Sequence, residues 1–262
     1  MVPWRLLALT IGLTSALLAQ TRITFPAEDG LPCTADLYLA KEDRTAPFIV
    51  LFHQAGYSRG EYRPIAPRLN QLGFNCMAVD ARCGSRAKGV PNETAAAAQA
   101  AGKPTGNYLD ALPDLLGALK YARKSHAAGK LVAWGSSYSS SLCLVVAGDH
   151  PELVDGVLAF SPGEYFQPDR PGGWVAESAA RLAAIPVFIT SGPYEGHQWK
   201  ALFEAIPSGT KRSFLPSEAA RLHGSSVLWG DLGNAEFPIP NSLAPAYWQA
   251  VEAFLAQNFA QR

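Results

Sequence analysis

The sequence predicts an α/β protein with a mostly parallel sheet, and three observations carry that prediction. Short, wholly apolar runs such as Phe48–Phe52 and Leu131–Trp134 are typical of strands that are buried on both faces. Segments with apolar residues at helical spacing, such as Tyr108–Ala127, separate these runs. Strands that alternate with helices along a chain form parallel sheets with helices on both faces.

The predicted sheet begins with an antiparallel hairpin, and the chain ends with a helix. Arg22–Phe25 and Thr34–Leu39 alternate between apolar and polar residues, and the turn signal Glu28–Gly30 separates them. Lys211–Leu215 is the last clear strand, and Tyr247–Phe259 closes the chain as an amphipathic helix. The predicted fold class is therefore α/β, with a mostly parallel central sheet, an N-terminal antiparallel hairpin and helices on both faces.

Residues 1–19 have the composition of a secretory signal peptide. Arg5 supplies a positive charge, and Leu6–Ala19 is almost wholly apolar with small residues near its end. The apolar run is too short to span a bilayer comfortably, so we expect cleavage near Ala19; an uncleaved anchor is the alternative. The mature chain is then a single domain over residues 20–262, without a membrane span, that is secreted or periplasmic.

The balance of charged residues bears on whether the chain binds nucleic acid or an acidic membrane surface. Lys plus Arg and Asp plus Glu both number 22, and no basic run with interleaved aromatic residues occurs. Neither nucleic acid nor an acidic membrane surface is therefore predicted as a partner. No Cys-x-x-Cys spacing or Cys/His cluster suggests a metal site, and we expect no cofactor. The oligomeric state is left open.

Four cysteines, Cys33, Cys76, Cys83 and Cys143, allow up to two disulfides in an exported chain. Cys33 and Cys83 fall at segment ends that could meet, so this pairing is one possibility. Cys143 is predicted on the helix behind the serine turn described next, where a free buried thiol is the ordinary interpretation.

The stretch Leu131–Cys143 carries the strongest functional signal. Its apolar strand runs directly into Gly135–Ser139 and then into an apolar helix. A serine in such a strand–turn–helix is typical of a nucleophile elbow, where small residues on either side let the two backbones approach closely. Gly135 and Ser139 occupy those positions around Ser137, although Gly is usual at the second. The alternative is that Ser137 only caps the helix.

This order of motifs resembles the α/β-hydrolase superfamily, most of all its small exported members of the dienelactone-hydrolase-like type. The motifs are the hairpin, His53–Gly56 after a buried strand, the elbow at Ser137, a late acid and His223-Gly224. The resemblance covers nearly all of the chain after the signal segment and implies the α/β-hydrolase fold. Dienelactone hydrolases proper carry Cys at the elbow, so Ser137 argues against that particular reaction.

A nucleophilic serine needs a base that removes its proton and a third group that orients the base. The resemblance implies that these partners follow Ser137 in the order acid, then histidine. Only His197 and His223 lie downstream with an acid at a plausible place between. His223 lies in a loop after the last predicted strand, where the base is expected, whereas His197 starts a helix and is interpreted as a surface residue.

The acid is predicted to be Glu195, which follows the strand Ile185–Thr190 at the place where the family usually has Asp. The longer Glu side chain is tolerated in such triads. Glu164, after the preceding strand, is the reserve acid because some members take their acid there. The alternative is that Glu195 is a solvated loop carboxylate.

Two backbone N–H groups are predicted to bind the oxyanion. One belongs to Tyr138, the residue after the nucleophile. The other is assigned to Ala55, because the loop after Phe52 resembles the His-Gly-x-Gly type of motif; its neighbour Gln54 is left open. The aromatic segment Glu164–Ala184 is either a substrate-facing flap or an ordinary crossover.

These residues together predict a serine hydrolase, a carboxylesterase that cleaves a small-molecule ester through a Ser-His-Glu triad and an acyl-enzyme. Peptidases and thioesterases use the same constellation, and a non-catalytic binding protein of the same fold is a further alternative. The aromatic residues that could line an acyl or aryl pocket, or else belong to the core, are Tyr57, Tyr138, Tyr165, Phe166, Trp174 and Trp199.

Overall fold

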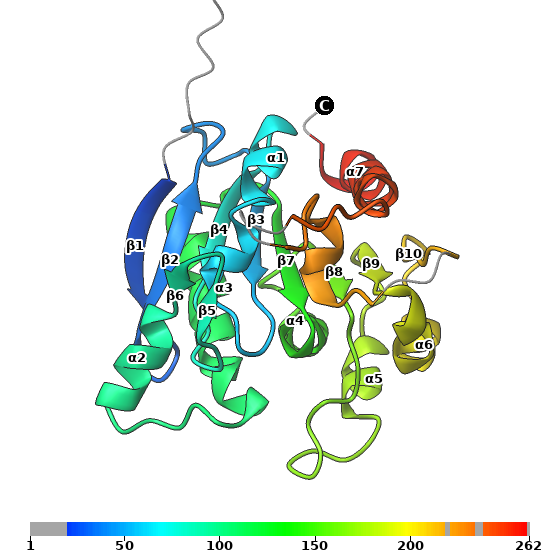
Figure 1. Ribbon diagram of the computed structural model, residues 1–262. Helices are drawn as coiled ribbons and strands as arrows, with labels where there is room; N and C mark the ends of the chain where they lie inside the picture. Colours follow the sequence, from blue (N-terminus) through cyan, green and yellow to red (C-terminus); the bar gives the residue numbers. More distant parts are fainter. Residues whose placement is uncertain (1–19, 218–220, 234–237, 261–262) are drawn as a thin grey trace, which may run out of the picture.

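The computed structural model describes residues 20–217, 221–233 and 238–260; the predicted signal peptide, residues 1–19, lies outside them. Within these ranges an eight-stranded sheet has the order β1-β2-β4-β3-β7-β8-β9-β10 (Figure 1). Its strands are β1 (Gln20–Pro26), β2 (Pro32–Tyr38), β3 (Phe48–Phe52), β4 (Asn75–Val79), β7 (Leu131–Ser136), β8 (Gly156–Phe160), β9 (Val187–Thr190) and β10 (Arg212–Phe214). A separate hairpin consists of β5 (Arg86–Ala87) and β6 (Val90–Pro91).

The pairing of the strands confirms the predicted fold class. The hairpin β1–β2 is antiparallel, and β2 also pairs antiparallel with β4. Every other pairing, from β4 through β3, β7, β8 and β9 to β10, is parallel. Each residue of β3 and of β8 is buried, because helices cover both faces of these central strands.

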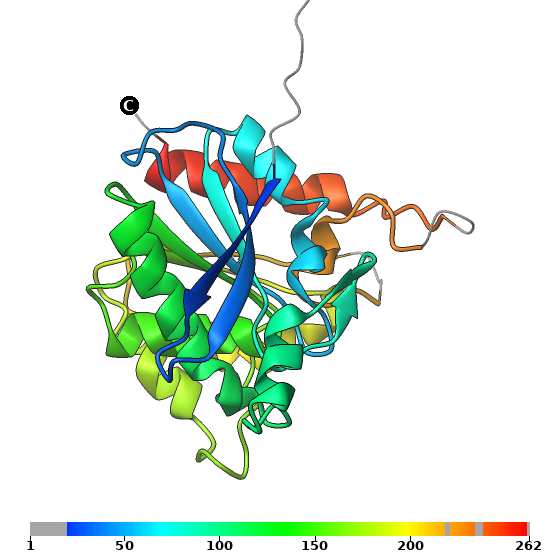
Figure 2. The ribbon, with the colours of Figure 1, turned by 90° about the vertical axis from the view of Figure 1, so that its left-hand side faces the viewer.

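Helices pack on both faces of the sheet (Figure 2). Alternate side chains of a strand point to opposite faces, so Val50 belongs to the core cluster that includes residues of α3, α4, α5 and α6, while Ile49 belongs to the cluster that includes residues of α1 and α7. No helix in the described ranges is long and apolar enough to cross a bilayer. The helices are α1 (Ala66–Gln71), α2 (Glu93–Ala100), α3 (Leu112–Ser125), α4 (Tyr138–Asp149), α5 (Trp174–Ala179), α6 (Gly196–Ala205) and α7 (Ala244–Phe259).

Several short 3₁₀ turns join these elements, and one of them corrects a predicted boundary. The expected helix Tyr108–Ala127 consists of η2 (Tyr108–Ala111) followed by α3. Pro113 lies in the first turn of α3, where a residue without an N–H is tolerated, so the α-helix begins there. The remaining turns are η1 (Arg59–Tyr62), η3 (Pro193–Glu195) and η4 (Gly224–Leu228).

The four cysteines are free, so the possible pairing of Cys33 with Cys83 does not form. The thiol of Cys33 donates to Oδ1 of Asp114 at 3.4 Å, and that of Cys83 donates to the carbonyl oxygen of Asn107 at 2.8 Å. Cys143 is a buried free thiol in α4, as predicted. Burial raises the pKa of each of these three thiols, so they remain protonated at neutral pH.

A buried arginine anchors η1 to the sheet. The guanidinium of Arg59 lies 3.0 Å from Oδ1 of Asp36 on β2, 2.5 Å from Oδ2 of Asp80 after β4, and 3.0 Å from Oε1 of Glu93 on α2. The side chain of Arg59 is fully buried, so its charge is balanced by carboxylates rather than by water. These ion pairs fix the segment that follows the loop after β3.

Candidate active site

Ser137 lies between β7 and α4 in a backbone conformation that residues other than glycine rarely adopt. Its φ is +58° and its ψ is −128°. Such strain persists only where the surroundings enforce it, and it is concentrated at functional sites. A Cβ at Gly135 would lie 2.3 Å from Cα of Ser140, so only glycine fits at that point of the turn. The turn therefore has the geometry of a nucleophile elbow.

Ser139 explains how a residue other than glycine fits the second small position of the elbow. Its hydroxyl accepts the N–H of Ser136 at 2.9 Å and contacts the carbonyl oxygens of Phe52 at 2.8 Å and of Ser136 at 2.9 Å. Because these partners lie on β7 and β3, Ser139 ties the elbow to the end of the neighbouring strand.

The loops after β7, β8 and β9 meet at the carboxyl edge of the sheet. The N–H of Ser137 donates to the carbonyl oxygen of Phe160 at 2.7 Å, and the N–H of Ser161 donates to that of Thr190 at 2.7 Å. Ligands of open α/β sheets bind in the crevice outside this edge. Ser137, Ser161 and the η3 residue Glu195 are therefore carried to the same edge of the sheet.

The structure brings two of the predicted residues, His223 and Glu195, into direct contact. Nδ1 of His223 lies 2.5 Å from Oε1 of Glu195. The other carboxylate oxygen, Oε2, accepts the hydroxyl of Ser161 at 2.6 Å and the N–H of Gly192 at 3.2 Å. Burial alone would raise the pKa of Glu195, but the hydrogen bonds of His223, Ser161 and Gly192 outweigh it and lower that pKa. Glu195 is therefore a carboxylate at neutral pH, suited to orient an imidazole.

The backbone after His223 is fixed by its glycine. The N–H of Gly224 donates to Oγ of Ser161 at 2.8 Å. Gly224 has a φ of +59°, and a Cβ there would lie 2.2 Å from Oγ of Ser136. The side chain of His223 is 39% exposed, and its Nδ1 is engaged by Glu195, which leaves Nε2 for exchange of a proton with a ligand.

Two other predicted candidates lie in different surroundings. The carboxylate of Glu164 accepts the N–H groups of Val175 at 3.1 Å and Ala176 at 3.0 Å. Glu164 therefore caps the start of α5, and its oxygens are occupied there rather than at His223. His197 is exposed on α6, as expected of a surface residue.

The N–H groups of the two predicted oxyanion donors have no acceptor among the residues that the structure describes. Tyr138 is the first residue of α4, so its N–H has no intrahelical acceptor. The described part of the chain provides no acceptor for the N–H of Ala55. By contrast, the N–H of Gln54 donates to Oε2 of Glu61 at 2.8 Å. Of the two candidates in this loop, only Ala55 keeps a donor available for a ligand.

The last helix, α7, supports both segments that carry the His–Glu pair. The hydroxyl of Tyr247 donates to the carbonyl oxygen of Ser191 at 2.7 Å, shortly before Glu195. Nε1 of Trp248 donates to the carbonyl oxygen of Leu228 at 2.9 Å, at the end of η4. α7 therefore restrains the turns on both sides of the contact.

Two residues of the site, Ser161 and Glu61, were not predicted from the sequence. Ser161 contacts both Glu195 and Gly224, and the only available cue is its place directly after a buried strand. Glu61 is fully buried, but η1 is too short to show an apolar periodicity that would predict this burial. Their roles depend on contacts between distant segments.

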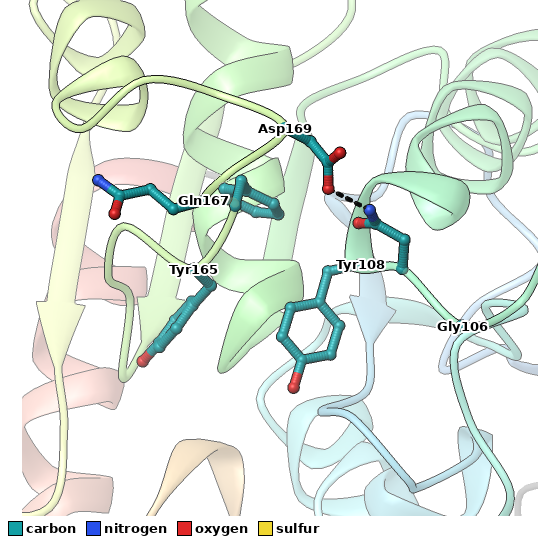
Figure 3. Close-up of a pocket in the computed structure, with 7 residues that line it drawn as sticks. Gly106, Tyr108, Tyr165, Gln167 and Asp169 are labelled. Atoms are coloured by element: carbon teal, nitrogen blue, oxygen red, sulfur yellow. Dashed lines mark hydrogen bonds between the residues drawn. The ribbon is translucent and has the colours of Figure 1, made fainter.

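A pocket lies beside the elbow, between two loops (Figure 3). Its volume is about 260 Å³, and the rings of Tyr108 and Tyr165 form two of its walls. Tyr108 stacks on Tyr138 at 4.7 Å between ring centroids, and the hydroxyl of Tyr165 donates to the carbonyl oxygen of Ser161 at 2.7 Å. The full lining is Gly106, Asn107, Tyr108, Tyr165, Phe166, Gln167 and Asp169.

Tyr165 connects this pocket with the elbow. Burial raises the pKa of Tyr165 to about 12, and the nearby side chain of Ser137 opposes that rise. The amide of Asn107 donates to Asp169 and so joins the two loops at another point of the pocket. Tyr165, Phe166, Gln167 and Asp169 of the predicted aromatic segment Glu164–Ala184 thus supply one wall of this pocket, and whether the segment faces a substrate stays a prediction.

The other aromatic candidates do not line this pocket. Tyr138 is fully buried and Trp199 is 6% exposed, so both belong to the core rather than to a ligand surface. Trp174 packs edge-on against Phe166, behind the pocket wall. Within the described ranges, no three His, Cys, Asp or Glu side chains gather as a metal site requires.

No family model and no curated protein matches this sequence. The structure, however, is similar to solved hydrolases. An esterase from Pyrococcus furiosus has a TM-score of 0.68 at 14% identity over 93% of this chain and 94% of its own. Dienelactone hydrolase from Anabaena variabilis has a TM-score of 0.64 at 15% identity, over 92% and 99%.

A third similar structure is Est1E from Butyrivibrio proteoclasticus with ferulic acid bound. Its TM-score is 0.61 at 14% identity, over 91% of this chain and 100% of its own. At such low identity the likeness establishes the fold and leaves the reaction open. The chain therefore has a dienelactone-hydrolase-like α/β-hydrolase fold.

Proposed function

We propose that this chain is a serine esterase that uses Ser137, His223 and Glu195 as its catalytic triad. The observation that carries the proposal is the strained elbow at Ser137, at the same sheet edge as a His–Glu contact of 2.5 Å. The similar esterase structures from two organisms agree with ester hydrolysis. A non-catalytic protein would have no need of a strained serine at the same sheet edge as an oriented imidazole.

In the proposed mechanism, Oγ of Ser137 attacks the ester carbonyl carbon while Nε2 of His223 takes the hydroxyl proton. The N–H groups of Ala55 and Tyr138 bind the oxyanion of the tetrahedral intermediate. Cleavage of the carbon–oxygen bond releases the alcohol, which receives the proton from His223. Water then attacks the acyl-enzyme with His223 again as base, which restores Ser137 and releases the acid.

The pocket between Tyr108 and Tyr165 is proposed to hold one side of the substrate. Its volume of about 260 Å³ lies below the usual range for sites of drug-sized ligands, so it suits a short acyl or a single-ring group. Tyrosine rings supply apolar faces, whereas Asp169 places a negative charge and no lining residue carries a positive one. We therefore expect uncharged esters to be preferred over esters with a carboxylate.

A series of p-nitrophenyl esters of increasing acyl length, assayed with wild type and Ser137→Ala, tests the proposal. We expect hydrolysis of short esters by wild type, no hydrolysis by the variant, and labelling of wild type alone by a fluorophosphonate. Full activity in Ser137→Ala refutes the assignment of the nucleophile. Labelling without ester hydrolysis indicates a different acyl substrate, such as a thioester or an aminoacyl amide.

We also propose that the chain is exported and that residues 1–19 are removed. The support is their composition, with one positive charge before an apolar run that ends in small residues. Mass spectrometry of the protein recovered from an expressing bacterium should give a mature N-terminus near Gln20 in the periplasm or medium. A protein that retains Met1 in the cytoplasm contradicts this proposal.

A further inference from the structure

Glu61 is a fully buried carboxylate without a cationic partner in the described part of the chain. Arg59, two residues earlier, is occupied by Asp36 and Asp80. A buried charge is costly unless hydrogen bonds compensate it, so a carboxylate at such a position needs donors for both of its oxygens. The donors that bind the two oxygens of Glu61 therefore indicate why a carboxylate occupies this buried position.

The two oxygens of Glu61 bind two segments of the candidate site. Oε2 accepts the N–H of Gln54 at 2.8 Å, directly before Ala55, the proposed oxyanion donor. Oε1 accepts the hydroxyl of Ser136 at 2.7 Å, directly before the nucleophile Ser137. The same carboxylate thus restrains the residues that precede both groups.

A third segment is reached through Ser136. Its Oγ accepts the N–H of Ser225 at 2.8 Å, two residues after His223. Ser225 is held further by Nε1 of Trp134, which donates to its hydroxyl at 2.9 Å. Because the hydroxyl of Ser136 must donate to Glu61, the carboxylate fixes the orientation in which Ser136 accepts from the His223 loop.

We propose that Glu61 is a positioning residue that sets the oxyanion loop, the elbow and the His223 loop relative to one another through its ionised carboxylate. The inference rests on the proposed function, since it assigns a role in that same site. Glu61 itself touches neither the substrate nor Ser137, and it acts only through Gln54 and Ser136.

The ionisation of Glu61 makes this role measurable. Burial raises the pKa of Glu61 to about 7, although the donors Gln54 and Ser136 oppose the rise. The titratable groups that face it are His223 on its loop, Tyr57, Tyr62 and Tyr138. The tyrosines have raised pKa values, so they do not change charge near neutral pH. Protonation of Glu61 removes an acceptor from Ser136 or from Gln54.

The test is the kcat of Glu61→Gln relative to wild type, measured on a short p-nitrophenyl ester from pH 5.5 to 9. An amide oxygen can accept from only one of the two donors, while the side-chain volume is retained. We expect a loss of about 10- to 100-fold in kcat above pH 7, because misplacement by about 1 Å costs up to about 100-fold. The ratio should approach one at pH 5.5, where wild-type Glu61 is protonated too.

Two variants complete the experiment. Ser136→Ala leaves Gln54 bound to Glu61 but cuts the link to Ser225, so it should lose kcat with the same pH dependence and to a smaller extent. It also keeps the proposal testable when Glu61→Gln does not fold. Glu28→Gln is the matched control, because its exposed carboxylate binds Lys120 on α3 and contacts neither Gln54 nor Ser136, and it should retain the wild-type pH profile.

A kcat of Glu61→Gln within about twofold of wild type at every pH overturns the inference, as does a loss that is equal at all pH values. If wild type hydrolyses esters but the ratio of the kcat of Glu61→Gln to that of wild type does not change with pH, the role of Glu61 is refuted while the proposed function stands. Wild type that neither hydrolyses esters nor reacts with a fluorophosphonate refutes the proposed function, and the role of Glu61 with it.

Discussion

Replacing Ser161 with alanine removes one hydroxyl that serves both halves of the His–Glu contact. The hydroxyl donates to Oε2 of Glu195 at 2.6 Å and accepts the N–H of Gly224 at 2.8 Å. A hydrogen bond to a charged group contributes about 1.5–3 kcal/mol, and a buried N–H left unsatisfied costs about 1–3 kcal/mol. Because both bonds share one hydroxyl, the two losses do not simply add, and we expect the free energy of unfolding to fall by about 3 kcal/mol.

Thermal unfolding and ester hydrolysis measure the two consequences. For a chain of this size Tm falls about 2–4 °C for each kcal/mol, so Ser161→Ala should unfold about 6–12 °C below wild type. We expect kcat/KM to fall about tenfold, because Glu195 keeps its charge but loses a restraint on its orientation.

Ser161→Gly is the matched control for this substitution. It loses the same hydroxyl, but glycine tolerates the φ of +55° at this position, so it should lose equal activity and less stability. A Ser161→Ala protein with Tm within about 2 °C and kcat/KM within about twofold of wild type would refute the reasoning.

Three further predictions concern neighbouring residues. Glu195→Gln should lower kcat by 100-fold or more, on the order of 10⁴-fold at most. Because the pKa of Glu195 is lowered from 4.5, its contribution to stability is present above that pH and is lost on acidification. Below about pH 5, the free energy of unfolding measured in urea should therefore change less with pH in Glu195→Gln than in wild type. Gly224→Ala, with its φ of +59° and its clash with Ser136, should lose more than about 1 kcal/mol of unfolding free energy in urea. Tyr165→Phe should lower kcat/KM about fivefold, the value of one hydrogen bond of about 1 kcal/mol, with Tm nearly unchanged.

The parts of this fold that could be predicted have local cues. An apolar run such as Phe48–Phe52 shows its burial in its own composition, and the elbow is visible because strand, turn and helix are consecutive. The same holds for the hairpin, whose strands β1 and β2 flank a turn signal. The predicted start of an α-helix at Tyr108 was wrong, because helical spacing of the apolar residues continues from η2 into α3 while the backbone hydrogen bonding changes.

The support of the site could not be predicted, because it depends on contacts between distant residues. Glu61 and Ser136 are 75 residues apart, and Ser161 and Gly224 are 63 apart. The sequence assigned the oxyanion donor to Ala55 but left Gln54 open, and only the bond between the Gln54 N–H and Glu61 shows that the N–H of Gln54 is occupied. The free thiols of Cys33 and Cys83 are a similar case, since their acceptors lie on other segments.

The position of α7 has a consequence for how the protein folds during its synthesis on the ribosome. Tyr247 and Trp248, close to the C-terminus, hold the turns before Glu195 and after His223. The elbow and its strands are translated long before these two residues, yet the turns that carry Glu195 and His223 gain the bonds from α7 only when that helix leaves the exit tunnel. A nascent chain is therefore expected to bind no active-site label until α7 has left the ribosome and packed against these turns.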